Sequence, residues 1–139
     1  MNWLVYALLS AVFAGLVGIL GKVGVAEVDS TTATGVRAFV MAGVMALAMT
    51  ALGSWGKLGT LTAKPMLFIV LSGTAGAASW ICYFKALQLG QASQVAPIDR
   101  LSGVITLVLA IAFLHEKVST PTLAGTALMV VGALLVARG

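Results

Sequence analysis

The chain has 139 residues, of which 60% are hydrophobic and only 9% are charged. A soluble domain carries about 25% charged residues, so this composition excludes a water-exposed globular fold and makes lipid the main solvent. The formal net charge of +4 comes from scattered basic residues with no interleaved aromatics, which excludes a nucleic-acid-binding surface.

Five nearly uncharged apolar runs fill most of the chain, and each predicts a transmembrane helix. A helix needs about 20 apolar residues to cross a bilayer core. We therefore expect an all-α membrane bundle, with helices at about residues 3–25, 31–52, 65–89, 93–115 and 119–137. The connections are too short to hold a further domain, so residues 1–139 are expected to form one domain.

The first helix begins with Trp3 and Tyr6, aromatic residues that favour the headgroup layer. It lacks the basic start and the cleavage site of a secretory signal, so we expect it to be retained. Glycines recur every third residue at positions 15, 18, 21 and 24. They predict a thin surface for close helix packing or, alternatively, a sliding surface beside a solute path.

The second and third helices have clear boundary signals. Asp29 or Ser30 is a good N-cap for the second helix, and Gly53 is expected to stop it. Pro65 is a favoured first residue for the third helix. Small residues at 73–79 allow another helix to approach the middle of the third helix closely.

The fourth helix is expected to start around Ser93, with Pro97 tolerated in its first turn, and to end at residues 115–117. The fifth helix follows Pro121. Its Gly125 and Gly132 lie on nearly the same face, so they suit helix packing within the subunit or between two subunits of a dimer.

No catalytic or cofactor motif is present. The sequence has no nucleotide-binding loop, no metal-ligand spacing of His and Glu, and no serine nucleophile elbow. The single cysteine, Cys82, cannot form an internal disulfide and has no partners for a metal site. We expect no enzyme activity, no cofactor and no metal.

Residues 79–90, SWICYFKALQLG, and residues 92–100, ASQVAPIDR, resemble the signature of EamA-type proteins in the drug/metabolite transporter superfamily. That signature has a tyrosine-bearing third helix ending in Ala-Leu, a small polar turn, an early proline in the fourth helix and a glutamate at its end. Tyr83, Pro97 and Glu116 match it here, and Arg37 lies where many members have an arginine. The resemblance implies a transporter of small organic solutes, but it specifies no substrate.

Typical members of that family have two five-helix repeats, whereas this sequence resembles the small bacterial members with one. Many secondary transporters enclose their site between two repeats, so we expect a homodimer. Its two copies are expected to insert in opposite orientations, as the small multidrug resistance proteins do. A parallel dimer, or pairing with a second small protein, is the alternative.

The loop charges are compatible with either insertion. Each membrane face receives three loop cations, with Lys57, Lys64 and Lys117 on one face and Lys22, Lys85 and Arg138 on the other. Equal numbers give no positive-inside preference, which favours dual topology. Counting the deeper Arg37 and Arg100 would instead favour a single orientation.

Arg37, Lys85, Asp99 and Arg100 are all expected toward the same membrane face. In a structural interpretation, Asp99 pairs with an arginine and Lys85 extends to the headgroups. In a functional interpretation, Arg37 and Arg100 form a positive vestibule for an anionic or zwitterionic metabolite.

Trp80 and Tyr83 lie on one face of the third helix, where they either stack on substrate or simply pack. The first helix has no carboxylate, so a coupling glutamate in that helix is not available. Asp99 and Glu116 are the candidates for proton coupling. Glu116 is alternatively interfacial, pairing with Lys117 or capping the last helix near Ser119.

These features together predict a multi-pass protein of the bacterial inner (cytoplasmic) membrane. It is expected to work as a half-size transporter that exports a small organic metabolite or a drug-like solute. The candidate substrate-binding residues are Arg37, Trp80, Tyr83, Asp99 and Arg100. The alternatives are a non-transporting subunit that assembles or regulates a membrane complex, and a flippase for a lipid-linked intermediate.

Overall fold

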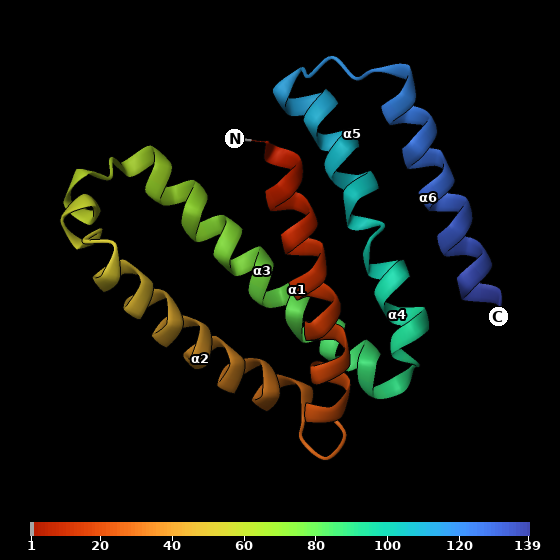
Figure 1. Ribbon diagram of the computed structural model, residues 1–139, viewed down its shortest axis with the longest axis horizontal. Coiled ribbons are helices and arrows are strands. Elements are labelled where there is room, and N and C mark those ends of the chain that lie inside the picture. Colours follow the sequence, from red (N-terminus) through yellow and green to blue (C-terminus); the bar gives the residue numbers. More distant parts are fainter. Residues whose placement is uncertain (1) are drawn as a thin grey trace. The chain divides into compact units, whose positions relative to one another are not determined.

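The computed structural model describes residues 2–139, and its elements are helices (Figure 1). They are α1 (Trp3–Gly24), α2 (Ser30–Ala51), the 3₁₀ helix η1 (Trp55–Thr60), α3 (Ala63–Leu89), α4 (Ala92–Asp99), α5 (Ser102–Leu114) and α6 (Thr120–Arg138). With α4 and α5 taken as one segment, Ala92–Leu114, five segments are long and apolar enough to span a membrane. The predicted all-α fold with five transmembrane helices is therefore confirmed.

Side-chain caps begin α2 and α6. The Asp29 carboxylate accepts hydrogen bonds from the backbone N–H groups of Thr31 at 2.9 Å and Thr32 at 3.1 Å, so Asp29 is the predicted N-cap. These hydrogen bonds stabilise the charged carboxylate and hold the pKa of the exposed Asp29 below its ordinary value, and the bond from Thr32 has the larger effect. The hydroxyl of Ser119 caps α6 by accepting from the Thr122 backbone N–H, a role that Glu116 does not take.

The fourth predicted helix is interrupted, which the sequence analysis did not anticipate. Pro97 lies inside α4 rather than in its first turn, and α4 ends two residues later at Asp99. Proline removes a backbone donor and crowds the preceding turn, which weakens a helix around it. Between α4 and α5 the backbone forms hydrogen bonds of the 3₁₀ type. The N–H of Leu101 donates to the Ile98 carbonyl, and the N–H of Gly103 donates to the Arg100 carbonyl.

Two other helix ends differ in detail from the sequence-based boundaries. α3 begins at Ala63, two residues before Pro65. α5 ends at Leu114, and the C-cap residue His115 is left-handed, with a φ of 53°. The Glu116 backbone N–H donates to the Ala110 carbonyl at 3.2 Å. A left-handed residue is a common way to close a helix, and histidine tolerates that conformation better than most side chains do.

Contacts divide the chain into two units. One comprises Gly21–Gln88: the last turn of α1, then α2, η1 and α3. The other combines the stretch up to Leu20 with Leu89–Gly139. In the latter, α6 runs back beside the bent α4–α5 segment and packs mainly on α4 (Figure 1).

The Gly21–Gln88 unit has its most buried apolar side chains where the end of α1 and the α1–α2 loop meet the end of α3. Val25, Phe84 and Leu87 are all almost fully buried. A Cβ atom added to Gly21 would lie 3.1 Å from Cε1 of Phe84 and 3.4 Å from Cδ1 of Leu87. The missing side chain of Gly21 therefore lets α1 approach α3 closely at this one position of the glycine pattern, whereas a Cβ added at Gly15 or Gly24 would meet no atom within 4 Å.

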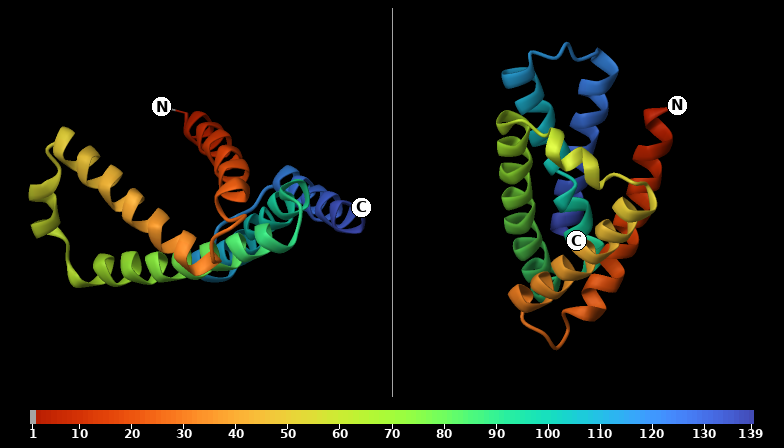
Figure 2. Two further views of the ribbon diagram at one scale, coloured as in Figure 1. Left: turned by 90° about the horizontal axis from the view of Figure 1, so that it is seen from below. Right: turned by 90° about the vertical axis from the view of Figure 1, so that its left-hand side faces the viewer.

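Polar side chains tie the α1–α2 loop to the last turn of α3. The Gln88 side-chain amide donates to the carbonyls of Val25 at 3.2 Å and Val28 at 2.6 Å. The Lys22 ammonium donates to the Leu87 carbonyl, one of the last carbonyls of α3, where a cation also interacts favourably with the helix dipole. From this corner, α2 and α3 diverge toward η1 (Figure 2).

Most large apolar side chains are exposed. Phe39 on α2 is 82% exposed, Phe113 on α5 is 77% exposed, and long exposed runs also occur on α1 and α3. Such surfaces would drive aggregation in water, whereas lipid tails solvate them. The exposed surface therefore agrees with the five predicted membrane spans.

We expect Gly21→Val to destabilise the Gly21–Gln88 unit by about 1–3 kcal/mol, because the larger side chain overpacks against Phe84 and Leu87. Gly24→Val is the matched control, since no atom lies within 4 Å of the Cβ added there. Thermal unfolding in detergent should separate the two variants. Equal unfolding midpoints would contradict the close α1–α3 contact.

Candidate functional site

The antiparallel arrangement of α2 and α3 brings Arg37 and Trp80 to the same depth. Arg37 follows the start of α2 by about two turns, or about 10 Å at 1.5 Å per residue. Trp80 precedes the end of α3 by slightly more, about 13 Å. Since the start of α2 is tied to the end of α3, these two side chains meet well inside the predicted spans.

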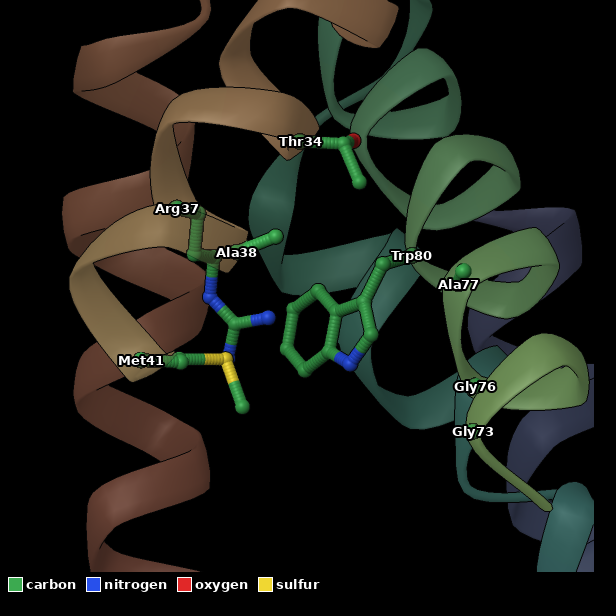
Figure 3. A pocket seen from close by; sticks show the side chains of 8 residues that line it. All are labelled: Thr34, Arg37, Ala38, Met41, Gly73, Gly76, Ala77 and Trp80. Atoms are coloured by element: carbon green, nitrogen blue, oxygen red, sulfur yellow. The ribbon is translucent and has the colours of Figure 1, made fainter. Parts of the chain in front are cut away.

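A pocket of about 320 Å³ lies between the two helices. Each helix contributes four residues at the same relative positions, a spacing of three, one and three that defines one helix face. The lining residues are Thr34, Arg37, Ala38 and Met41 of α2 and Gly73, Gly76, Ala77 and Trp80 of α3 (Figure 3). The absent or minimal side chains on α3 leave the hollow.

Arg37 and Trp80 point toward one another in this pocket (Figure 3). The guanidinium carbon of Arg37 lies 3.4 Å from the centroid of the Trp80 ring. Such a cation–π contact contributes about 0.5–2 kcal/mol, with the larger values where water is excluded. The contact therefore holds the cation at one wall of the pocket and ties α2 to α3 within the span.

Two further aromatic residues of α3 support the Trp80 indole. Its ring centroid lies 5.4 Å from that of Tyr83 and 5.6 Å from that of Phe84, both in edge-to-face geometry. Tyr83 and Phe84 are buried, so they restrict the indole to few orientations. The aromatic group thus fixes the ring on which Arg37 lies.

No carboxylate neutralises Arg37 within its own unit. The two acidic residues of Gly21–Gln88 are Glu27 and Asp29, both in the α1–α2 loop. Asp29 is engaged at the N-cap of α2. The described lining therefore combines one fixed cation, a π face, a thioether and a threonine hydroxyl, which suits binding and orientation of a small solute rather than bond chemistry.

The structure brings together two of the five predicted substrate-binding residues. Arg37 and Trp80 line the pocket, whereas Tyr83 lies outside its lining and packs on Trp80. Asp99 and Arg100 lie in the other unit, where α4 is interrupted. No ion pair forms between these two neighbours in the part of the chain that the structure describes.

The remaining predicted residues lie elsewhere. Glu116 follows the left-handed end of α5. A Cβ added at Gly125 or Gly132 on α6 would meet no atom within 4 Å. Across residues 2–139, no group of three or more His, Cys, Asp or Glu side chains is placed to hold a metal ion.

Six of the lining residues were not predicted from sequence as components of a site: Thr34, Ala38 and Met41 of α2, and Gly73, Gly76 and Ala77 of α3, the last three within the small segment noted only for helix packing. A signal was present, because each set recurs on one helix face with Arg37 or Trp80 as a member. Helix spacing alone, however, does not show which face of α2 opposes which face of α3.

Comparison with known proteins places the chain in a family. Its residues 1–138 match the EamA-like transporter family. The chain belongs to this family. It is thus a multi-pass membrane protein of a transporter family, as the signature at residues 79–100 indicated.

Two relatives were found. A Sinorhizobium protein named "Uncharacterized transporter in cobO 3'region" is 43% identical over 136 residues, which cover 98% of this chain and 96% of that protein. An uncharacterized protein of Methanocaldococcus jannaschii is 29% identical over 72 residues, about half of each chain. No solved structure matches the sequence.

The stacking of Arg37 on Trp80 should be visible by fluorescence. In a variant whose only tryptophan is Trp80 (Trp3→Phe, Trp55→Phe), Arg37→Gln should change the intensity and maximum of the emission, because it removes a cation 3.4 Å from the ring. Lys64→Gln, which removes a cation outside the pocket lining, should leave the emission unchanged. An unchanged spectrum in Arg37→Gln would contradict the contact.

Proposed function

We propose that this protein exports a small organic solute across the cytoplasmic membrane of a bacterium and binds it in the α2–α3 pocket. The observation that carries the proposal is a charged and aromatic pocket inside two predicted spans of an EamA-like transporter family member. A cation within a span is costly, and residues of that kind commonly mark substrate pathways. The relative named a transporter, with 43% identity, supports the same activity.

Arg37 and Trp80 are the proposed first contacts of the solute. Arg37 supplies charge and hydrogen-bond donors, and Trp80 supplies a flat apolar surface. Tyr83 acts as a positioning residue, because its edge contact fixes the indole. Gly73 and Gly76 keep the space opposite α2 open.

Asp99 and Arg100 form a second candidate binding element. They lie at the interruption between α4 and α5, and broken transmembrane helices commonly line transporter sites because their backbone groups are available to ligands there. Asp99 is also the first candidate for proton coupling, since it is the carboxylate at this interruption. Glu116, beyond the end of α5, is the second candidate.

A homodimer is proposed as the working unit. The lining residues of the pocket come from α2 and α3, so transport would require further helices to close it from each side in turn. This five-span sequence aligns with 96% of the length of the Sinorhizobium relative. A protein of that length holds one such bundle, so a second copy would supply the second bundle. Gly125 and Gly132 on α6 leave open space for a helix of the second copy.

Transport should depend on the volume of the pocket. Gly76→Leu fills it, yet no atom lies within 4 Å of the added Cβ, so folding should be retained while solute flux is lost. Gly43→Leu is the matched control, because it makes the same change on α2 outside the pocket lining.

The measurement has two stages. Thermal stabilisation of the purified protein by a panel of organic acids, amines and neutral solutes selects a cargo, since a ligand at 100 times its Kd stabilises by about 2.7 kcal/mol. Flux of that cargo in proteoliposomes then compares the variants. Undiminished flux in Gly76→Leu would remove the pocket from the pathway, and a protein that moves nothing would be a non-transporting subunit.

Dual topology predicts that about half of the chains expose their C-terminus on each membrane face, because the loop cations are balanced. Gly139→Cys in a Cys82→Ser background can be labelled in intact cells with an impermeant maleimide, with lysed cells as the reference. Removal of Lys57 and Lys64 should shift the labelled fraction strongly. Complete or absent labelling of the parent would establish a single orientation.

A further inference from the structure

The charge of Arg37 is fixed and its hydrogen-bond capacity is unused within its unit. Arginine remains protonated in proteins and has five N–H donors. One face of this guanidinium is covered by the Trp80 ring, whose centroid is 3.4 Å away. Within Gly21–Gln88 the guanidinium donates to no oxygen, so its donor-bearing edges remain free for a ligand.

The surrounding charges do not compensate for this cation. The Gly21–Gln88 unit holds five basic residues against two acidic ones. Two other basic residues, Lys22 of α1 and Lys85 of α3, lie at the corner, where they bond to the Leu87 carbonyl and to the Gln88 side chain, respectively. The field in the pocket is therefore positive, which attracts anions and repels cations.

The rest of the pocket is apolar. Ala38 and Met41 on α2 face the small residues of α3, and the indole forms the wall beside the charge (Figure 3). A guanidinium whose face is covered binds through its edge, and the edge matches the two oxygens of a planar carboxylate. The cavity volume of about 320 Å³ lies at the lower end of the range of roughly 300–1,000 Å³ that is typical of ligand pockets, which suits a small solute.

We propose that the cargo is a small organic monoanion whose carboxylate binds the edge of Arg37 and whose apolar body lies between Trp80 and Met41. This inference rests on the proposed transport function and names its substrate class. One cation matches one negative charge, and a dianion would bring an unpaired charge into the span. An amine would meet Arg37 as a like charge, and a neutral solute would leave its donors unused.

Three probes with the same ring isolate the charge: benzoate, benzylamine and benzyl alcohol. Binding is measured in lipid nanodiscs at neutral pH from the emission of Trp80, in the variant that lacks Trp3 and Trp55. Benzoate should bind at least tenfold more tightly than either other probe, because hydrogen bonds to charged groups are the stronger class. Gly76→Leu should abolish the signal, which separates binding in the pocket from partition into lipid.

Variants of Arg37 test the contact directly. Arg37→Gln should weaken benzoate binding at least tenfold, and Arg37→Lys should restore it only in part, since lysine keeps the charge but not the planar edge. Arg138→Gln, the loss of an arginine at the end of α6, should leave binding unchanged. Helix content by circular dichroism confirms that each variant is folded.

The inference is overturned if benzylamine or benzyl alcohol binds as tightly as benzoate, if Arg37→Gln binds benzoate normally, or if none of the probes binds. Its failure is distinguishable from failure of the transport proposal. Arg37-dependent benzoate binding without flux of carboxylates in proteoliposomes would leave the anion site standing and refute transport. Pocket-dependent flux of amines alone would do the reverse.

Discussion

The register between α2 and α3 depends on the corner where the α1–α2 loop meets the last turn of α3. The Gln88 amide holds two loop carbonyls, and Lys22 holds a carbonyl of α3. Gly21 lets the end of α1 lie against Phe84 and Leu87. Because this corner aligns the start of one helix with the end of the other, Arg37 and Trp80 occupy the same depth and the pocket forms between them.

The same corner lies at the helix ends, where backbone groups lose their helical partners and must find others. Gln88 and Lys22 satisfy carbonyls there, and Asp29 satisfies the first N–H groups of α2. Inside the spans, the backbone is bonded within each helix and side chains face lipid or the pocket. Among the charged side chains of the Gly21–Gln88 unit, Arg37 lies farthest from a helix end.

Much of this arrangement follows from sequence because lipid imposes simple rules. Apolar length predicts the spans, Asp29 precedes two threonines in a standard capping pattern, and Arg37 and Trp80 stand out as costly or bulky residues in otherwise small, apolar surroundings. The family signature at residues 79–100 identified the transporter family. Each of these depends on residue type and on neighbours along the chain.

The features that sequence missed depend on contacts between distant segments. Nothing local to Gln88 indicates that its amide bonds to carbonyls about 60 positions earlier, and nothing local to Gly73 indicates that Arg37 lies opposite. The interruption after Asp99 was missed for another reason: Pro97 was expected in the first turn of a helix beginning near Ser93, whereas it lies beyond the first turn from either start, where proline disrupts the helix.

The composition of the pocket lining has an energetic consequence for a monoanionic cargo. None of its eight residues exchanges protons near neutral pH, since Arg37 is permanently charged. An inside-negative membrane potential pushes each exported negative charge outward with about 2.3 kcal/mol per 100 mV. For the proposed monoanionic cargo, this electrical term would favour efflux more than tenfold at about 100 mV, so export of such a cargo would not require a proton-binding group in the pocket.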